Sequence, residues 1–395
     1  MSDSVDEAYF ENDSYIPLHT GEDSSKYLNA LNPPVFLTSL HTFDNMADYQ
    51  HNPNGAFVYG RYGNPNEKIV EEKIAALEHG KRAFLYPSGM GAASAAIMAV
   101  CKAGSHVVCV HNAYGCVGTF LEEYCKPDLN MDVTFVHGWS TDEIRDAIRD
   151  NTALIILESP GTATFSLVDL EAVSKIAKEK GIVTYIDNTY CSPIFQKPLT
   201  MGIDIVMHSA TKYLGGHSDI LGGVLVTSDD RLSERLKTLK TLVGGIKGPM
   251  EAWLLMRGLR TLPVRMKAHE AIALKVAQEL EKDPHVKKVY YPGLPSHPQY
   301  ELVKKQQSGS SGLLSFELNA TTEEAVKVVE HMKVFKLGPS WGGFESLIVM
   351  PLWGKTDEYA AWYGASRGLI RIHCGLEGAD VLLADLKQAF ALLDE

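Results

Sequence analysis

The sequence predicts an α/β protein with a mostly parallel sheet, and three observations support this class. From residue 64 onward, short runs rich in β-branched residues alternate with helical stretches, as expected of strands joined by crossover helices. Residues 182–186 and 203–207 are typical of such buried strands, and polar residues follow each of them, where open α/β sheets bind ligands. A length of 395 residues also exceeds one compact core, so we expect two domains.

The larger domain is expected to contain seven strands and their helices. The strands are predicted at residues 84–86, 106–110, 132–136, 153–157, 182–186, 203–207 and 224–227. The helices are predicted at residues 64–78, in the alanine-rich stretch after Gly91, and at 141–149, 167–178, 230–242 and 249–262. Asn64 as N-cap, Pro65 at the first helical position and Gly80 after the last turn delimit the first of them.

Three segments are predicted along the chain. Residues 1–63 hold clusters of Pro, Asn and Gly with little periodicity, so we expect an arm that packs on a neighbouring subunit. Residues 64–256 form the larger domain. Residues 257–395 form a smaller α/β domain, with helices at 264–283, 323–332 and 381–393 and strands at 286–291, 313–318 and 369–373.

Composition excludes several classes of function. A net charge of −12 provides no basic field for nucleic acid or for an anionic membrane surface. No apolar run approaches the ~20 residues of a membrane span, and the acidic first 27 residues lack signal-peptide features, so a cytoplasmic protein is expected. The six cysteines show no metal-ligand spacing, so we expect reduced thiols and no metal site.

An amine and an acid are predicted to meet at one edge of the sheet. Lys212 follows a strand, with Ser209 and Thr211 just before it, which suits a Schiff-base amine whose neighbouring hydroxyls bind a phosphate. Asp187 ends the adjacent strand and suits the partner of a protonated pyridine nitrogen. Together these residues predict a pyridoxal 5'-phosphate site.

The stretch Ser209-Ala-Thr-Lys-Tyr-Leu-Gly-Gly-His-Ser-Asp219 resembles the signature of the pyridoxal-phosphate-dependent enzymes of cysteine and methionine metabolism. This family of trans-sulfuration enzymes includes cystathionine β-lyase, cystathionine γ-lyase, cystathionine γ-synthase and methionine γ-lyase. The resemblance runs from about Pro33 to the C-terminus. It implies the fold-type I architecture of the aspartate aminotransferase class, with a large seven-stranded cofactor domain and a smaller C-terminal α/β domain.

Two further segments match the cofactor residues of this family. Ser88, Gly89 and Met90 form a small-residue turn before a helix, whose free N–H groups suit a phosphate. Tyr114 follows the next strand; the resemblance implies that it stacks on the cofactor ring, and its phenol could also protonate a leaving thiolate, although packing at the rim is an alternative.

The end of the arm implies a shared site. The segment from Tyr59 to Pro65 resembles the family's Tyr-x-Arg-x-x-Asn-Pro, with Asn66 where the pattern usually has Thr. The resemblance implies that Tyr59 and Arg61 reach the cofactor phosphate of the neighbouring protomer. A dimer is then the minimal catalytic unit, and a homotetramer is expected. An exposed turn without this role is the alternative.

Substrate residues are expected in the smaller domain. Arg371 lies within an apolar strand, where its charge needs a partner, and the resemblance implies that it clamps the α-carboxylate of an amino acid; a structural ion pair is the alternative. The segment from Ser340 to Leu347 resembles that of cystathionine β-lyase, in which Ser340 would help to hold the carboxylate and Trp341 would wall the pocket.

These features predict a carbon–sulfur lyase that releases pyruvate, ammonia and a thiol, as cystathionine β-lyase does. Gly161, Thr162 and Trp341 favour β-elimination, whereas Cys116 and Pro339 depart from the β-lyase pattern. Elimination or replacement at Cγ is therefore the alternative. A nicotinamide dehydrogenase is disfavoured because no Gly-x-Gly-x-x-Gly follows a first strand, and a scaffold without turnover is disfavoured because the lysine, aspartate and arginine are all present.

Overall fold

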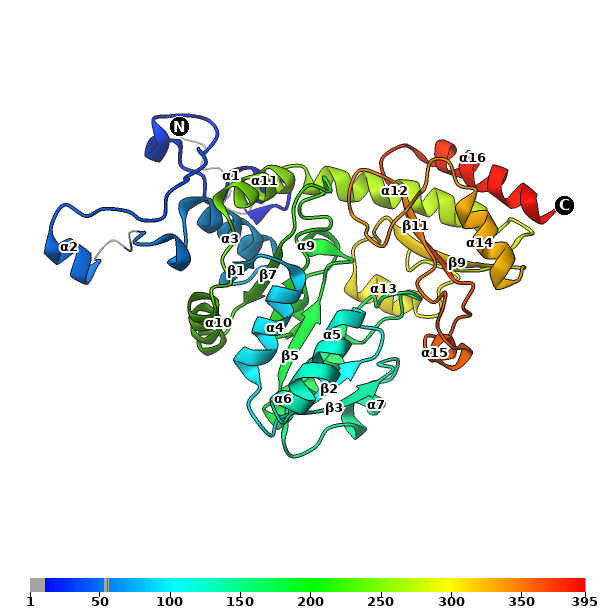
Figure 1. Cartoon of the computed structure of the whole chain (residues 1–395), viewed down its shortest axis with the longest axis horizontal. Coiled ribbons are helices and arrows are strands. Elements are labelled where there is room, and N and C mark those ends of the chain that lie inside the picture. Colours follow the sequence, from blue (N-terminus) through cyan, green and yellow to red (C-terminus); the bar gives the residue numbers. More distant parts are fainter. Residues whose placement is uncertain (1–10, 53–54, 56, 395) are drawn as a thin grey trace, which may run out of the picture.

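The computed structural model describes residues 11–52, 55 and 57–394, and its larger sheet has seven strands within these residues (Figure 1). Their order across the sheet is β1-β7-β6-β5-β4-β2-β3. The strands are β1 (Arg82–Tyr86), β2 (His106–Val110), β3 (Asp132–Val136), β4 (Thr152–Glu158), β5 (Val183–Asp187), β6 (Ile205–His208) and β7 (Gly223–Thr227). The predicted α/β class and the mostly parallel seven-stranded sheet are confirmed.

The direction of the strands determines where the functional loops lie. Neighbouring strands are parallel from β6 through β5, β4 and β2 to β3. Strand β7 is antiparallel to both β6 and β1, so β1 runs in the same direction as β6. The carboxyl ends of β1, β2, β4, β5 and β6 therefore open on the same edge of the sheet, where α/β proteins bind their ligands.

Helices cover this sheet and form the arm. They are α1 (Ile16–His19), α2 (Met46–His51), α3 (Pro65–Leu77), α4 (Gly89–Val100), α5 (Gly115–Phe120), α6 (Lys126–Asp128), α7 (Thr141–Asp146), α8 (Leu170–Lys180), α9 (Ser192–Phe195), α10 (Asp230–Val243), α11 (Pro249–Leu259) and α12 (Leu262–Leu280). Short 3-10 or π turns lie at Ser24–Tyr27, Gly60–Tyr62, Leu121–Cys125 and Pro198–Met201. The predicted N-cap is present, because the Asn64 side chain accepts the N–H of Glu67 at 3.0 Å.

Helix α8 begins later than the sequence pattern predicts. Asp169 is its N-cap and accepts the N–H of Ala172 at 3.1 Å. The N–H of Leu167 instead donates to the Gln299 side chain at 2.7 Å. A partner distant in sequence thus holds the start of the predicted 167–178 helix in an extended form.

A second sheet of five strands lies in the C-terminal part of the described chain, in the order β10-β11-β12-β9-β8. Its strands are β8 (Val286–Tyr290), β9 (Leu313–Leu318), β10 (Lys336–Leu337), β11 (Leu347–Val349) and β12 (Ile370–His373). The accompanying helices are α13 (Tyr300–Gln306), α14 (Thr322–Glu330), α15 (Asp357–Trp362) and α16 (Ala379–Phe390), and a 3-10 turn follows at Ala391–Leu393. The sequence pattern did not reveal β10 and β11, which have two and three residues.

Helix α12 carries the chain from the larger sheet to the second one (Figure 1). Each sheet packs against its own apolar core: the larger includes Leu85, Val108 and Ile156, the smaller Phe316 and Leu386. The predicted boundary between residues 256 and 257 falls inside α11 and stays a prediction. Among the described residues, no helix combines the length and apolar character needed to cross a bilayer.

The arm is partly docked on its own chain. Lys73 lies buried beneath it and bonds to the Pro17 carbonyl and to Glu22, both at 2.9 Å. Asn66 accepts the N–H of Phe36 and donates to the Pro34 carbonyl, each at 2.9 Å. These two bonds explain why residue 66 has an amide side chain. Residues 1–10, 53, 54 and 56 of the predicted arm lie outside the described residues.

One buried acid makes the stability of the second domain testable. The Asp385 carboxylate accepts the backbone N–H groups of residues 333–335 at 2.8 to 3.0 Å. Asp385→Asn replaces one acceptor by a donor, so we expect urea unfolding followed by circular dichroism to show a loss of about 2 kcal/mol. Asp380→Asn on the same helix removes only an exposed pair with Lys275 and should change stability by less than about 0.5 kcal/mol. Equal effects of the two changes would contradict the prediction.

Candidate active site

A cavity of about 570 Å³ lies at the carboxyl edge of the larger sheet, and residues of the second domain close it from the other side. Eleven of the residues predicted from the sequence line it. They are Ser88, Gly89, Met90, Tyr114, Asp187, Ser209, Thr211, Lys212, Ser340, Trp341 and Arg371. The structure therefore brings together residues that are up to 283 positions apart in the chain.

Lys212 lies between the two domains. Its Nζ donates to Ser340 Oγ at 2.6 Å and lies 5.5 Å from the centre of the Trp341 ring. Burial and the positive charge of Arg371 lower the pKa of Lys212 to about 8, although the negative charge of Asp187 acts in the opposite direction. Close to neutral pH, a substantial fraction of the amine is therefore unprotonated and able to act as a nucleophile or base.

A glycine allows this close contact. Gly342 has a φ of +87°, and a Cβ at this position would lie 2.9 Å from Lys212 Cα. Any side chain here would therefore strain the backbone and collide with the lysine segment. The loop that carries Ser340 and Trp341 can lie on Lys212 only because residue 342 is glycine.

Two carboxyl groups meet at the ends of β4 and β5. Glu158 and Asp187 are register partners at this edge. Burial and the neighbouring Asp187 carboxylate raise the pKa of Glu158 to about 8. Burial also raises the pKa of Asp187, against the hydrogen bonds that the Thr189 N–H, at 2.9 Å, and hydroxyl donate to its Oδ1. Since it is unfavourable for both carboxyls to be ionised at the same time, a cationic group bound beside them would be stabilised.

The start of α4 forms a second part of the site. Ser88 is its N-cap and accepts the N–H of Gly91 at 3.0 Å, while the N–H groups of Gly89 and Met90 have no acceptor within the helix. A Cβ on Gly89 would lie 3.2 Å from Ser209 Oγ, so that hydroxyl stands directly beside the helix start. Helix N–H groups and adjacent hydroxyls suit a phosphate.

Arg371 projects from β12 into the cavity and is buried. Burial lowers the pKa of Arg371 to about 10, so the guanidinium stays charged at neutral pH. Its Nη2 donates to the Pro339 carbonyl at 3.0 Å. Among the described residues, no Asp or Glu lies within 4.0 Å of it, so the structural ion pair weighed from the sequence is absent.

The phenol of Tyr114 lies at the rim, and its residue is half-exposed. The Tyr114 N–H donates to Glu158 Oε2 at 2.7 Å, and Thr162 Oγ1 donates to Glu158 Oε1 at 2.7 Å. A hydrogen bond with Cys116, together with burial, raises the pKa of Tyr114 to about 12. The phenol therefore keeps its proton at neutral pH.

Two predicted residues lie away from this cavity. Tyr59 is partly exposed, and Arg61 Nη1 donates to the Thr241 carbonyl at 2.9 Å, at the end of α10. Neither residue lines the cavity of its own chain. The role in a neighbouring protomer stays a prediction.

Several residues that line the cavity have no role predicted from the sequence. These are Glu158, Thr189, Lys355, Tyr359 and Tyr363, among others. An acid at the end of a strand beside Asp187 was a usable signal for Glu158. The residues near α15 had no such signal, because that helix is short and its place depends on rings from the first domain: the His111 ring lies 4.2 Å from that of Tyr363.

Comparison with known proteins determines the family. The model of the Cys/Met metabolism PLP-dependent enzymes matches residues 15–391. The chain belongs to this family. It is 38% identical to the cystathionine beta-lyase of Coxiella burnetii over 94% of this chain and 96% of the relative. It is also 38% identical to the L-methionine gamma-lyase of Fusobacterium nucleatum subsp. nucleatum, with the same coverage. The crystal structure of metB from Corynebacterium glutamicum has 34% identity and a TM-score of 0.91, covering 97% of this chain and 98% of that one.

The family depends on pyridoxal phosphate, and the residues present fit that cofactor. The paired carboxyls of Glu158 and Asp187 favour a cationic group, such as a protonated ring nitrogen. The start of α4 and the Ser209 hydroxyl suit a phosphate. An amine with a lowered pKa lies in the same cavity. The carbon–sulfur lyase class expected from the sequence agrees with this family. Its members are named for reactions at Cβ, as in cystathionine beta-lyase, or at Cγ, as in L-methionine gamma-lyase.

The lowered pKa of Lys212 predicts a pH dependence in cofactor-free protein. Since the unprotonated amine reacts with aldehydes, we expect reductive methylation of Lys212 to rise with a midpoint near pH 8, about two units below a free lysine. Arg371→Met should raise this midpoint, because it removes a like charge. Arg367→Met, which alters an exposed pair with Asp357, should not. Peptide mapping by mass spectrometry measures the midpoint, and a value near 10 in the unchanged protein would contradict the prediction.

Proposed function

We propose that the protein is a β-eliminating carbon–sulfur lyase that converts a substrate such as L-cystathionine to pyruvate, ammonia and a thiol. The observation that carries the proposal is Lys212 held against Ser340 and Trp341, in a segment that resembles the β-lyase pattern. Position 339 favours neither reaction, because Pro339 is neither the Glu of many γ-enzymes nor the Tyr of the bacterial β-lyase.

The residues of the cavity divide into cofactor and substrate groups. Lys212 would hold the cofactor, Asp187 would pair with its ring nitrogen and Tyr114 would stack on the ring. Ser88, Gly89, Met90, Ser209 and Thr211 would hold its phosphate. Bound pyridoxal phosphate supplies an electron-accepting ring that stabilises negative charge on the substrate's α-carbon. Arg371 would clamp the α-carboxylate with two parallel hydrogen bonds, and Ser340 would add a third.

Two protons have to move. Lys212, with a pKa near 8, is matched to accept the α-proton at neutral pH. The leaving thiolate needs a proton, and a thiol has an ordinary pKa of about 8.5. Lys212 is closer to this value than Tyr114, whose pKa is raised to about 12. We therefore assign both transfers to Lys212 and orientation of the leaving group to Tyr114.

Reaction at Cγ is the second candidate. Relatives named cystathionine beta-lyase are 38% identical to this chain and relatives named L-methionine gamma-lyase are 37 to 40% identical, so identity does not decide between the two reactions. Cys116 at the rim, beside Tyr114, is the observation that favours chemistry of the methionine γ-lyase kind.

The products of L-cystathionine test the reaction directly. With the cofactor-loaded protein, we expect pyruvate and homocysteine, identified by mass spectrometry. Lys212→Ala should lower the rate about 1,000-fold or more, because both proton transfers depend on its amine. Mainly 2-oxobutyrate and cysteine would refute β-elimination, and full activity of Lys212→Ala would refute the site.

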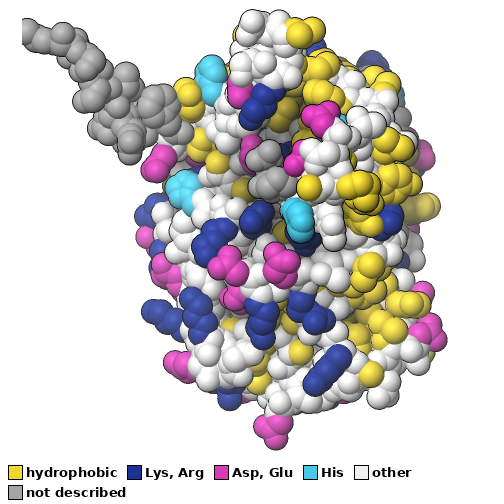
Figure 2. Space-filling model, turned by 90° about the vertical axis from the view of Figure 1, so that its left-hand side faces the viewer, with side chains coloured by type: hydrophobic (Ala, Val, Ile, Leu, Met, Phe, Trp, Pro, Cys, Tyr) yellow, Lys and Arg dark blue, Asp and Glu magenta, His cyan; other side chains and the backbone are white. Residues whose placement is uncertain are grey.

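We further propose that two protomers share each site and that two such dimers form a tetramer. Figure 2 faces the side of the molecule where the arm and α10 lie, and hydrophobic side chains gather along one flank of it. Apolar side chains that are at least two-thirds exposed in this region are Leu28, Leu31, Leu37, Met46, Leu242 and Val243. Exposed apolar side chains gathered on one face are typical of an interaction surface, and a second copy would cover them.

Complementation between two inactive variants tests the shared site. If Arg61 serves the neighbour's cofactor, Arg61→Ala and Lys212→Ala chains should each be inactive alone. When the two chains are unfolded and refolded together, mixed dimers contain one intact site, so activity should return. Separately refolded samples mixed afterwards are the control. A mixture that stays inactive although mixed dimers form would contradict the sharing of residues.

A further inference from the structure

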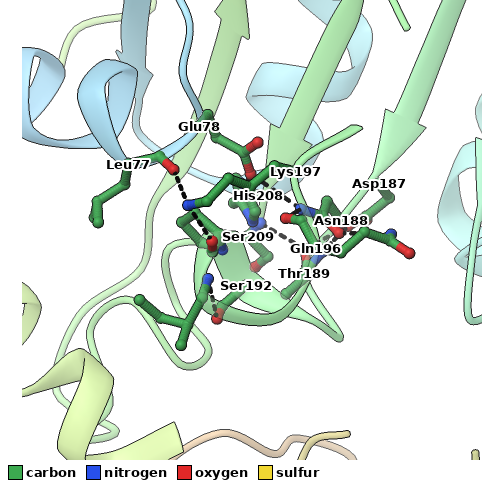
Figure 3. A network of polar contacts seen from close by, with 12 residues as sticks. Leu77, Glu78, Asp187, Asn188, Thr189, Ser192, Gln196, Lys197, His208 and Ser209 are labelled. Carbon is green, nitrogen blue, oxygen red and sulfur yellow. Dashed lines mark hydrogen bonds and ion pairs between the residues drawn. The ribbon is translucent and has the colours of Figure 1, made fainter. Parts of the chain in front are cut away.

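A buried acid lies beneath the cavity and contacts the ends of two strands (Figure 3). Glu78, which follows the last turn of α3, is fully buried. Its Oε1 accepts a hydrogen bond from Asn188 Nδ2 at 3.0 Å and one from His208 Nε2 at 2.5 Å. Asn188 directly follows β5, and His208 is the last residue of β6. One oxygen atom thus bridges the carboxyl ends of two adjacent strands.

The bridged residues are the sequence neighbours of cavity residues. Asp187 precedes Asn188, and Ser209 follows His208. Since side chains alternate along a strand, Asn188 and His208 point away from the cavity that Asp187 and Ser209 line. The Glu78 contact therefore acts from the opposite face of the sheet.

A second bridge lies on the cavity side. The Thr189 hydroxyl donates to Asp187 Oδ1 and accepts the N–H of Ser209 at 2.8 Å. Figure 3 shows the contacts of Thr189 and those of Glu78 in one view. The ends of β5 and β6 are therefore tied together twice, once on each face.

The bridge through Glu78 has no substitute nearby. Glu78 Oε2 and His208 Nδ1 are buried and have no hydrogen-bond partner among the described residues. Asn188 keeps a second bond, from its Nδ2 to the Gln196 carbonyl at 2.9 Å, whereas Glu78 is the one side chain that His208 contacts by a described hydrogen bond. Loss of the Glu78 carboxylate would leave the His208 ring buried and unpaired.

We propose that Glu78 is a positioning residue for the cofactor site. Its Oε1 fixes the ends of β5 and β6 relative to each other and thereby sets the separation of Asp187, which would face the cofactor ring, from Ser209, which would hold the phosphate. The inference rests on the cofactor roles given to these two residues under the proposed function. Glu78 itself touches neither substrate nor cofactor.

Cofactor affinity in the absence of substrate tests the inference. Glu78→Met, which removes the bridging acceptor, and His208→Asn should each raise the dissociation constant of pyridoxal phosphate about tenfold, measured by titrating cofactor-free protein and following the visible absorbance. His208→Gln can place an amide donor close to the position of Nε2, so it should stay within about threefold of the unchanged protein. This rescue separates positioning from packing and remains decisive if Glu78→Met does not fold.

Asp385→Asn is the matched control, because it disturbs an equally buried carboxylate in the second domain. It should lower the free energy of unfolding and leave the cofactor affinity unchanged. Equal weakening by the control, or a dissociation constant within twofold for folded Glu78→Met, would overturn the proposal. Asp187→Asn and Ser209→Ala test the cofactor roles separately. If neither variant weakens the binding of pyridoxal phosphate, the roles given to Asp187 and Ser209 are wrong, whichever keto acid the loaded enzyme releases.

Discussion

The common direction of the strands is the constraint on which the site depends. Six of the seven strands in the larger sheet run the same way, and the exception, β7, lies between β1 and β6. Loops from distant parts of the sequence therefore reach one edge without any strand having to bend. The start of α4 follows β1, Asp187 ends β5 and Lys212 follows β6, and all three meet around one cavity.

Burial gives these groups their chemistry. Glu158 and Arg371 are buried, and Lys212 and Asp187 are partly buried, so each charge depends on its neighbours. The positive charge of Arg371 and the burial of Lys212 make the amine a better base. The mutual repulsion of Glu158 and Asp187 makes their edge of the cavity attract a cation. The cavity is thus suited to a molecule with a cationic ring and an anionic phosphate before any such molecule binds.

Most of the larger sheet could be predicted because its strands are short, rich in β-branched residues and separated by capped helices. The candidate site could be predicted where a strand is followed closely by a residue with acid, base or nucleophilic chemistry, as with Asp187 and Lys212. Elements without a local signal were missed: β10 and β11 depend on pairing with β12, and the position of α15 depends on rings of the first domain. Gly378, which directly precedes α16, has a φ of +97°, a conformation that favours glycine.

The two halves of the cavity come from separate stretches of the chain. The cofactor side is built from residues between 88 and 221, and the opposite wall from residues between 339 and 371. Because the two walls belong to different sheets, side chains of the second wall can change without moving the strand ends that build the first. Evolution can therefore alter which bond is broken by exchanging a few side chains in the second stretch. Relatives with different reactions can then diverge to the same extent from a common ancestor while the first stretch keeps the same chemistry.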